Sequence, residues 1–409
     1  MPKSRVLMIL FDNYYPRDPR VRKEISTLNK RGIHVDLIAR RGEDELEREE
    51  MDLLTIHRVS FPLERRGGTL YGILYYGIFR HLALLEVLRR RKVHYDLIHV
   101  HDLPAAFSSV VAGRLLRIPV LVDLHEDWPD LIRLSARQDS FLSRSLSKLL
   151  YYLLRLEEGL TIRLADGIIT ISEAFREDLI SRGARGEKVV SVENFIDLKE
   201  MRRVEEVIKS RGYEKGERFR LVYVGGLVRD QGVDVPIRAV KELEGDLDLE
   251  FIVVGDGEEL PRLRALAKNL GIEDRVKFTG WLRFEDAMSY VASADLCIRS
   301  GVRSKQLEIT SPNKIFQYMY FAKPIAAADF KYVRRVIDEC GCGFLFEPEN
   351  HVDLARKILD NIDHLDEMGR KGREYVENKA NWDTVAEKLF KLYSRVIKSR
   401  WGKDLRNDH

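Results

Sequence analysis

Two histidines in this sequence directly follow segments that read as β-strands. Residues 96–100 form a short apolar run that His101 follows, and His125 follows a second run at 120–124. In α/β proteins, functional side chains lie at the carboxyl ends of parallel strands. An imidazole there can move a proton or stabilise developing charge. We therefore predict that His101 and His125 belong to an active site, against the alternative of structural histidines. His99, inside the first run, is expected to pack.

Two carboxylates adjoin the second histidine. Glu126 and Asp127 follow His125 directly, and either could accept a proton from a substrate hydroxyl. Glycoside hydrolases use a pair of carboxylates that flank the reacting bond. The sequence offers no clear pair of this kind, so hydrolysis is disfavoured.

Two stretches have residue types that suit phosphate. Gly225 and Gly226 end a predicted strand, and their missing Cβ atoms would let a phosphate approach the backbone. Ser311 and Pro312 are typical of a helix start, at the N-cap and the first helical position. Lys314 would lie in the first turn of that helix, whose free N–H groups also attract anions. The alternative for the two glycines is an ordinary tight turn.

A third basic stretch follows the first predicted strand. Arg17, Arg20 and Arg22 could bind a phosphate of a substrate. The alternative is a helix that starts at Asp18 and Pro19 and leaves the arginines solvated. We place Arg17 and Arg20 on the acceptor side of the site.

These residues are positioned by alternating strands and helices. Short runs of Val, Ile and Leu separated by helical patterns predict parallel sheets covered on both faces, an α/β fold. The expected domains are 1–200 and 215–385, with a charged connection over 197–218 and a final helix over 386–409. The predicted strands cover residues 5–10, 33–39, 96–100, 119–124, 167–171, 188–192, 220–224, 250–254, 275–278, 295–298, 324–328 and 343–346.

Composition excludes several classes of protein. The 409 residues are 44% hydrophobic and carry a net charge of +3, which argues against disorder and gives no case for nucleic-acid binding. Three cysteines cannot form a secreted disulfide framework, so we expect a cytoplasmic protein. We expect no signal peptide, membrane span, metal site or cofactor. Few glutamines among many charged residues suggest a heat-adapted source.

The sequence resembles the retaining nucleotide-sugar glycosyltransferases of family 4, which have the GT-B fold. The resemblance runs from about Val6 to Trp382, nearly the full chain. It rests on the order and spacing of six motifs, at Tyr15–Glu24, His99–Pro104, Asp123–Pro129, Tyr223–Leu227, Val254–Gly257 and Ser311–Lys314, the last continuing through Tyr318 to Pro324.

The resemblance implies transfer of a sugar from a nucleoside-diphosphate donor to an acceptor hydroxyl, with retention of configuration and without a metal. It implies a donor on the C-terminal domain, an acceptor on the N-terminal domain, and a last helix that returns to the N-terminal domain. His101 would lie near the reacting sugar. The implied donor-binding residues are Gly225, Gly226, Arg229, Gly255, Ser311, Asn313, Lys314 and Gln317.

The chain departs from the family pattern at the diphosphate and at the catalytic glutamates. Gly226 and Gln231 stand where the family has Arg and Lys, so Arg229 and Lys314 would have to supply the charge. Gln317 replaces a ribose-binding glutamate, and Ile309 replaces an earlier one. A non-catalytic partner subunit of a glycan-assembly complex is therefore the main alternative. An epimerase or phosphorylase of related architecture is a third reading.

Two stretches of the N-terminal half favour contact with a membrane surface. Residues 70–91 and 141–156 combine leucines and tyrosines at helical spacing with arginines and lysines. Amphipathic helices of this kind lie in lipid headgroups, although core helices look similar. A lipid-linked or membrane acceptor would fit such contact.

Overall fold

The computed structural model describes residues 4–11, 13–60, 69–135, 141–212 and 216–402. The chain divides into two compact units, residues 1–193 with 385–409 and residues 194–384. The division at 193 differs from the boundary expected at 200. Helix α7 (Leu198–Arg211), capped by the Asp197 carboxylate, occupies the expected connection and belongs to the second unit.

The first unit is built on an eight-stranded sheet in the order β3-β4-β2-β1-β5-β6-β7-β8. Neighbouring strands run parallel except β3 and β4, as a doubly wound domain requires. The strands are β1 Ser4–Leu10, β2 Ile33–Arg40, β3 Arg48–Met51, β4 Leu54–Val59, β5 Leu97–His101, β6 Val120–Leu124, β7 Gly167–Thr170 and β8 Val189–Ser191.

Every strand predicted from an apolar run is present, but β3 and β4 were not predicted. The sequence of β3 is Arg-Glu-Glu-Met, and most of its residues are exposed at the edge of the sheet. Charged residues at an edge protect the free backbone from pairing with another chain. They also remove the apolar pattern by which a strand is found in a sequence.

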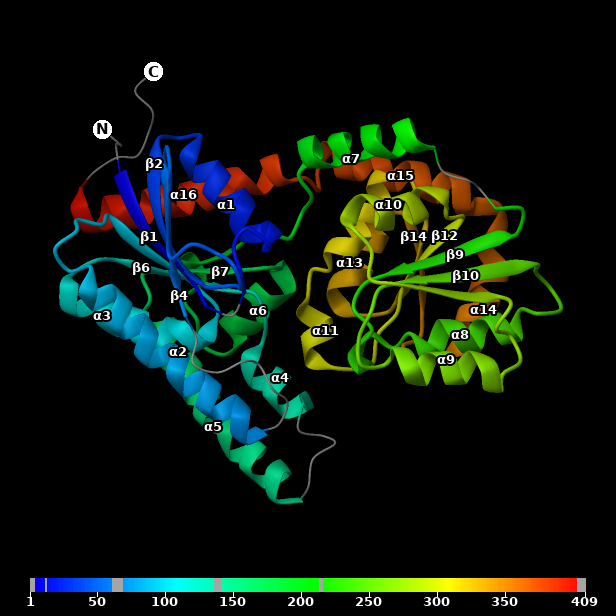
Figure 1. Ribbon diagram of the computed structural model, residues 1–409, viewed down its shortest axis with the longest axis horizontal. Helices are drawn as coiled ribbons and strands as arrows, with labels where there is room; N and C mark the ends of the chain where they lie inside the picture. Colours follow the sequence, from blue (N-terminus) through cyan, green and yellow to red (C-terminus); the bar gives the residue numbers. More distant parts are fainter. Residues whose placement is uncertain (1–3, 12, 61–68, 136–140, 213–215, 403–409) are drawn as a thin grey trace. The chain divides into compact units, whose positions relative to one another are not determined.

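Helices cover both faces of this sheet (Figure 1). They are α1 Pro19–Asn29, α2 Thr69–Arg89, α3 Leu103–Leu116, α4 Trp128–Ser135, α5 Phe141–Leu164, α6 Glu173–Ser181 and the last helix, α16 Trp382–Trp401. The Asp18 carboxylate accepts from the N–H groups of Arg20 and Val21, with Pro19 as the first helical residue. Helix α16 is tied to the sheet by Trp401, whose indole N–H donates to the Asp96 carbonyl at 2.9 Å. None of the described helices has the length and hydropathy needed to span a membrane.

The second unit has a six-stranded parallel sheet in the order β11-β10-β9-β12-β13-β14. Its strands are β9 Phe219–Val224, β10 Leu249–Val254, β11 Val276–Gly280, β12 Leu296–Arg299, β13 Ile325–Ala328 and β14 Gly343–Phe346. Besides α7, its helices are α8 Asp234–Glu242, α9 Leu260–Asn269, α10 Phe284–Ser293, α11 Lys305–Ile309, α12 Asn313–Tyr320, α13 Lys331–Cys340, α14 His351–Asn361 and α15 Leu365–Asn378. Cys340 and Cys342 form a disulfide after α13, and Cys297 is a buried free thiol.

Candidate functional site

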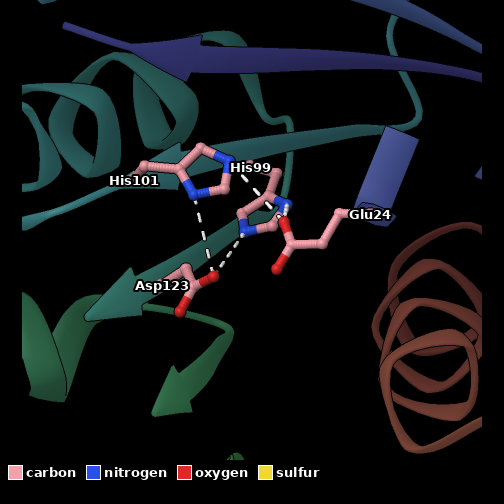
Figure 2. Close-up of side chains that lie close together, drawn as sticks. All are labelled: Glu24, His99, His101 and Asp123. Carbon is pink, nitrogen blue, oxygen red and sulfur yellow. Dashed lines mark ion pairs between the residues drawn. The ribbon is translucent and has the colours of Figure 1, made fainter. Parts of the chain in front are cut away.

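The two predicted histidines of the first unit meet in a buried polar cluster. In the register of β5 and β6, His101 lies beside Asp123, and His99 projects from the same face two residues earlier. The rings of His99 and His101 are 4.4 Å apart. Figure 2 shows these rings between two carboxylates, Asp123 on one side and Glu24 of α1 on the other. All four residues are buried.

Arg20 supplies the positive charge of this cluster. Its Nε and Nη2 donate to the two Asp123 oxygens at 2.9 and 3.1 Å, and Nη1 donates to the Val192 carbonyl at 2.7 Å. Its Nε also lies 3.1 Å from Glu24 Oε1. Burial alone would raise the pKa of Asp123, but Arg20 and then His125 outweigh it and hold that pKa well below its ordinary value.

The expected acceptor-side role of Arg20 is therefore not what its geometry supports. Its guanidinium is buried and bound within the first unit, whereas Arg17 is exposed and lies over the Tyr14 ring at 5.3 Å. A sequence shows both as arginines near a helix start and cannot show which one turns inward. Of these two arginines, Arg17 keeps the exposure that binding a substrate phosphate requires.

His125 connects the buried cluster to the surface. Its Nε2 lies 3.2 Å from both Asp123 Oδ2 and His101 Nδ1, and its Nδ1 lies 3.4 Å from Asp102 Oδ2. Its side chain is 15% exposed, against 0% for His101. Asp102 has φ of 62°, an unfavourable conformation for a non-glycine residue, and its carboxylate also accepts from the His125 N–H.

The pKa values of the histidines are driven apart by these surroundings. Burial would lower the pKa of His125, but Asp102 and Asp123 outweigh it and hold that pKa well above its ordinary value. Burial and the neighbouring histidines hold the pKa of His101 well below its usual range. Burial lowers the pKa of His99 to about 4. His125 is thus the protonated member of the cluster, and His101 and His99 are neutral.

His99 packs as expected, because its Nδ1 is hydrogen-bonded to the Tyr393 hydroxyl of α16.

The two carboxylates that follow His125, Glu126 and Asp127, have different surroundings. Asp127 is buried, receives a hydrogen bond from Arg155 at 2.7 Å, and caps α4 through the Asp130 N–H. Glu126 is exposed at the carboxyl edge of the sheet and keeps the access that a proton acceptor needs.

Glu24, His99, His101 and Asp123 could hold a metal ion by distance, since one ligand atom of each lies within 4.8 Å of the others. The Nε2 atoms of both histidines and both Glu24 oxygens have no hydrogen-bond partner among the described residues. Both Asp123 oxygens, however, already accept from Arg20. A metal ion would compete with this guanidinium and add a second cation beside it, so the residues fit a metal poorly.

In the second unit, Gly225 follows β9 with φ of 151°, and Lys314 of α12 lies over it. The Lys314 Nζ is 2.7 Å from the position that a Cβ of residue 225 would take. This amino group also lies 4.2 Å from the centre of the Tyr223 ring and donates to Gln231 Oε1 at 3.2 Å. The structure thus brings together the predicted glycine turn and the predicted lysine. Gly226 beside them is exposed.

Gly255 is required by backbone packing. It follows β10 with φ of 144°, and a Cβ there would lie 1.9 Å from the Gly225 carbonyl oxygen. The Gly225 N–H donates to the Val254 carbonyl at 3.0 Å. The loops after β9 and β10 therefore support each other, which explains Gly255 without a ligand.

The start of α12 differs from the prediction. The helix begins at Asn313 with Pro312 as N-cap, one residue later than expected. Ser311 is buried, and its hydroxyl donates to Tyr332 at 2.9 Å, so it does not cap the helix. Asn313 is exposed and Gln317, one turn later, is partly exposed on the same side of α12. Arg229 is exposed in the short turn Arg229–Gln231.

Arg299 is a functional candidate that the sequence analysis missed. It ends β12, is 1% exposed, and has no carboxylate in ion-pair contact within the described part of the chain. Burial lowers the pKa of Arg299, and burial followed by repulsion from Arg299 lowers that of Lys314. Arg299 is thus close enough to Lys314 to repel its amino group. An arginine at the end of an otherwise apolar strand was the signal available in the sequence.

We expect Arg20→Met to lower the free energy of unfolding by about 3–5 kcal/mol, because it leaves Asp123 buried without its cation. The matched control Arg17→Ala removes an exposed arginine and should cost less than about 1 kcal/mol. Urea unfolding of the three proteins measures both values. Equal losses in the two variants would contradict the assignment of Arg20 to the core.

His99 should make the protein less stable in acid. Its folded pKa of about 4 lies below the unfolded value of about 6.5. Its contribution is therefore complete above pH 6.5 and is lost as the pH falls toward 4. Relative to His99→Gln, the wild type should lose up to about 3 kcal/mol between about pH 7 and pH 4. Urea unfolding of both proteins across this range tests it, and a constant difference would contradict the shift.

Comparison with known proteins identifies the family of the chain. Residues 20–200 match the model of Glycosyltransferase Family 4, and residues 218–364 match that of Glycosyl transferases group 1. The chain is 24% identical to a glycosyltransferase of Methanocaldococcus jannaschii, MJ1069, over 61% of this chain and 64% of that protein. It is also 24% identical to alpha-monoglucosyldiacylglycerol synthase of Streptococcus pneumoniae, over 97% and 87% of the two chains.

Solved structures show the same fold. Sucrose-phosphate synthase of Thermosynechococcus elongatus superposes with a TM-score of 0.76 at 17% identity, over 97% of this chain and all of that chain. HepE of Anabaena, solved in complex with UDP, gives a TM-score of 0.67 at 17% identity, over 95% and 99% of the chains. The two matched models together cover most of the sequence, and the chain belongs to the family 4 glycosyltransferases with the GT-B fold.

Proposed function

We propose that this glycosyltransferase moves a hexosyl or N-acetylhexosaminyl group from a nucleoside-diphosphate sugar to an acceptor hydroxyl, with retention and without a metal. The observation that carries the proposal is the Lys314 amino group over Gly225 at the carboxyl end of β9. A cation beside a backbone without a side chain is suited to an anionic diphosphate. HepE, the structural neighbour described above, binds UDP.

We infer that Lys314 takes the place of the cations that the family resemblance implies at 226 and 231. Burial lowers the pKa of both Lys314 and Arg299, repulsion from Arg299 lowers that of Lys314 further, and Asp230 offsets these effects only in part. A bound diphosphate would relieve that repulsion. Gln231 orients Lys314 through the 3.2 Å hydrogen bond, so a lysine at 231 would bring another cation against it.

The proposed reaction needs little covalent chemistry from the protein. The bond between the anomeric carbon and the diphosphate oxygen breaks while a bond to the acceptor oxygen forms on the same face. The acceptor proton passes to the leaving diphosphate oxygen. His125, kept protonated by Asp102 and Asp123, would stabilise negative charge that develops on the reacting groups. Neutral His101 would position the His125 ring through the contact between their nitrogens. Glu126 is exposed beside His125 and would accept a hydrogen bond from an acceptor hydroxyl.

The acceptor that we favour is a lipid-linked or membrane hydroxyl in glycan, glycolipid or cell-envelope assembly. The S. pneumoniae relative is named as a glycolipid synthase. The second candidate function is a non-catalytic partner subunit. Gly226, Gln231 and Ile309, at positions where the family has charged residues, are the observation that favours it.

Calorimetric titration with UDP and with GDP, in the presence of a chelator, tests the donor site. We expect one nucleotide to bind and Lys314→Met to weaken it roughly 10-fold to 100-fold, the effect of losing one charged hydrogen bond. Lys371→Met, which removes an exposed lysine of α15, should leave affinity unchanged. No binding by the folded protein would favour the partner subunit. If the protein transfers a sugar, NMR of the product shows whether the anomeric configuration is retained.

Single substitutions at residues 226 and 231, where the chain departs from the family pattern, should change nucleotide affinity in opposite directions. A Cβ at residue 226 meets nothing within 4 Å and φ there is not positive, so Gly226→Arg can add a cation and tighten nucleotide binding several-fold. Gln231→Lys should weaken binding, because it removes the acceptor for Lys314 and adds like charge. The same titration measures both variants, and tightening by Gln231→Lys would contradict this account of Lys314.

A further inference from the structure

Helix α5 exposes large apolar side chains and buries its carboxylates, the opposite of a typical surface helix. Six large side chains on it are 37–64% exposed: Leu146, Leu149, Tyr152, Leu153, Leu156 and Leu160. Its two carboxylates, Glu157 and Glu158, are buried. A surface helix normally turns its leucines inward and its charges outward.

The exposed residues form one continuous stripe, which we call the leucine face. The leucines follow at intervals of three and four residues from 146 to 160, the spacing of one side of an α-helix. At 1.5 Å per residue the stripe is about 21 Å long. Monomeric soluble proteins rarely expose a contiguous apolar surface of this extent, so a partner is needed to cover it.

The inner side of α5 explains why this helix keeps its orientation. Glu157 pairs with Arg80 of α2, and Glu158 lies 2.9 Å from Arg155 and also pairs with Arg182. Arg155 thus lies on the inner side of α5. Turning the leucines inward would expose these ion pairs and break them.

The charges around the leucine face indicate the chemistry of its partner. Helices α2, α3, α4 and α5 carry only four carboxylates, Glu86, Asp130, Glu157 and Glu158, and all four are buried. Lys148 and Arg163 on α5 are exposed, as are Arg89 of α2 and Arg114 of α3. The outer side of these helices therefore offers cations and leucines but, among the described residues, no exposed carboxylate.

We propose that the leucine face inserts into the headgroup layer of an anionic lipid bilayer, with Lys148 and Arg163 against lipid phosphates. Leucines and a tyrosine beside cations are the composition of helices that lie in a membrane interface. A second copy of α5 is a poorer partner, because it brings the same cations to the face and no carboxylate to neutralise them. The side chains of 69–76 and 141–144, among them the predicted Leu70 and Leu142, lie outside the described residues.

Flotation of the full-length protein with lipid vesicles tests the proposal without requiring the transferase reaction. Vesicles of phosphatidylcholine with about 30 mol% phosphatidylglycerol should bind the protein, and pure phosphatidylcholine should bind it at least fivefold less, since two cations face the lipid. Leu149→Ser with Leu156→Ser should lower binding at least about tenfold. Leu46→Ser, which changes an exposed leucine elsewhere in the first unit, should not change it.

Three further measurements distinguish lipid insertion from unfolding and from dimer formation. An unchanged thermal unfolding transition of the Leu149 and Leu156 double variant shows that lost binding is not lost folding. A solvent-sensitive fluorophore on Leu156→Cys should shift to the blue with anionic vesicles, whereas one on Leu46→Cys should not. Binding that is unchanged in the double variant, equal on neutral vesicles, or absent would overturn the proposal. A dimer in light scattering that the double variant abolishes would also overturn it.

Discussion

The first unit is organised around one buried ion pair, between Arg20 of α1 and Asp123 of β6. Asp123 is also the carboxylate that holds His125 protonated, and His125 in turn contacts neutral His101. The charge state of the histidines therefore depends on a guanidinium that is unavailable to any substrate. A buried ion pair gives little net stability, since both charges lose their hydration. Its value here is to fix the proton positions of the groups next to it.

The second unit also buries positively charged side chains. Lys314 and Arg299 are neighbouring cations without an ion-paired carboxylate among the described residues. Burying them together is unfavourable, and hydrogen bonding to Gln231 and the Tyr223 ring compensates in part. The proposed diphosphate site rests on this arrangement of a lysine beside a glycine turn.

The strands and the strand-end position of His101 could be predicted because they depend on local patterns. Strand β3 could not, since its four residues are mostly charged and its pairing comes from β4. The role of Arg20 was missed because its partner is 103 residues away in sequence. The inverted orientation of α5 depends on arginines of α2 and on Arg182, so its leucine spacing fitted a core helix equally well.

The hydrogen bond between Tyr393 and His99 constrains the order in which the chain can assemble. Tyr393 lies on the last helix, and the entire second unit separates it in sequence from β5. During synthesis, β5 emerges long before the residue that completes its polar contacts. The first unit therefore finishes folding after the second unit has been made, and a protein shortened to its first 193 residues would retain a buried histidine without its partner.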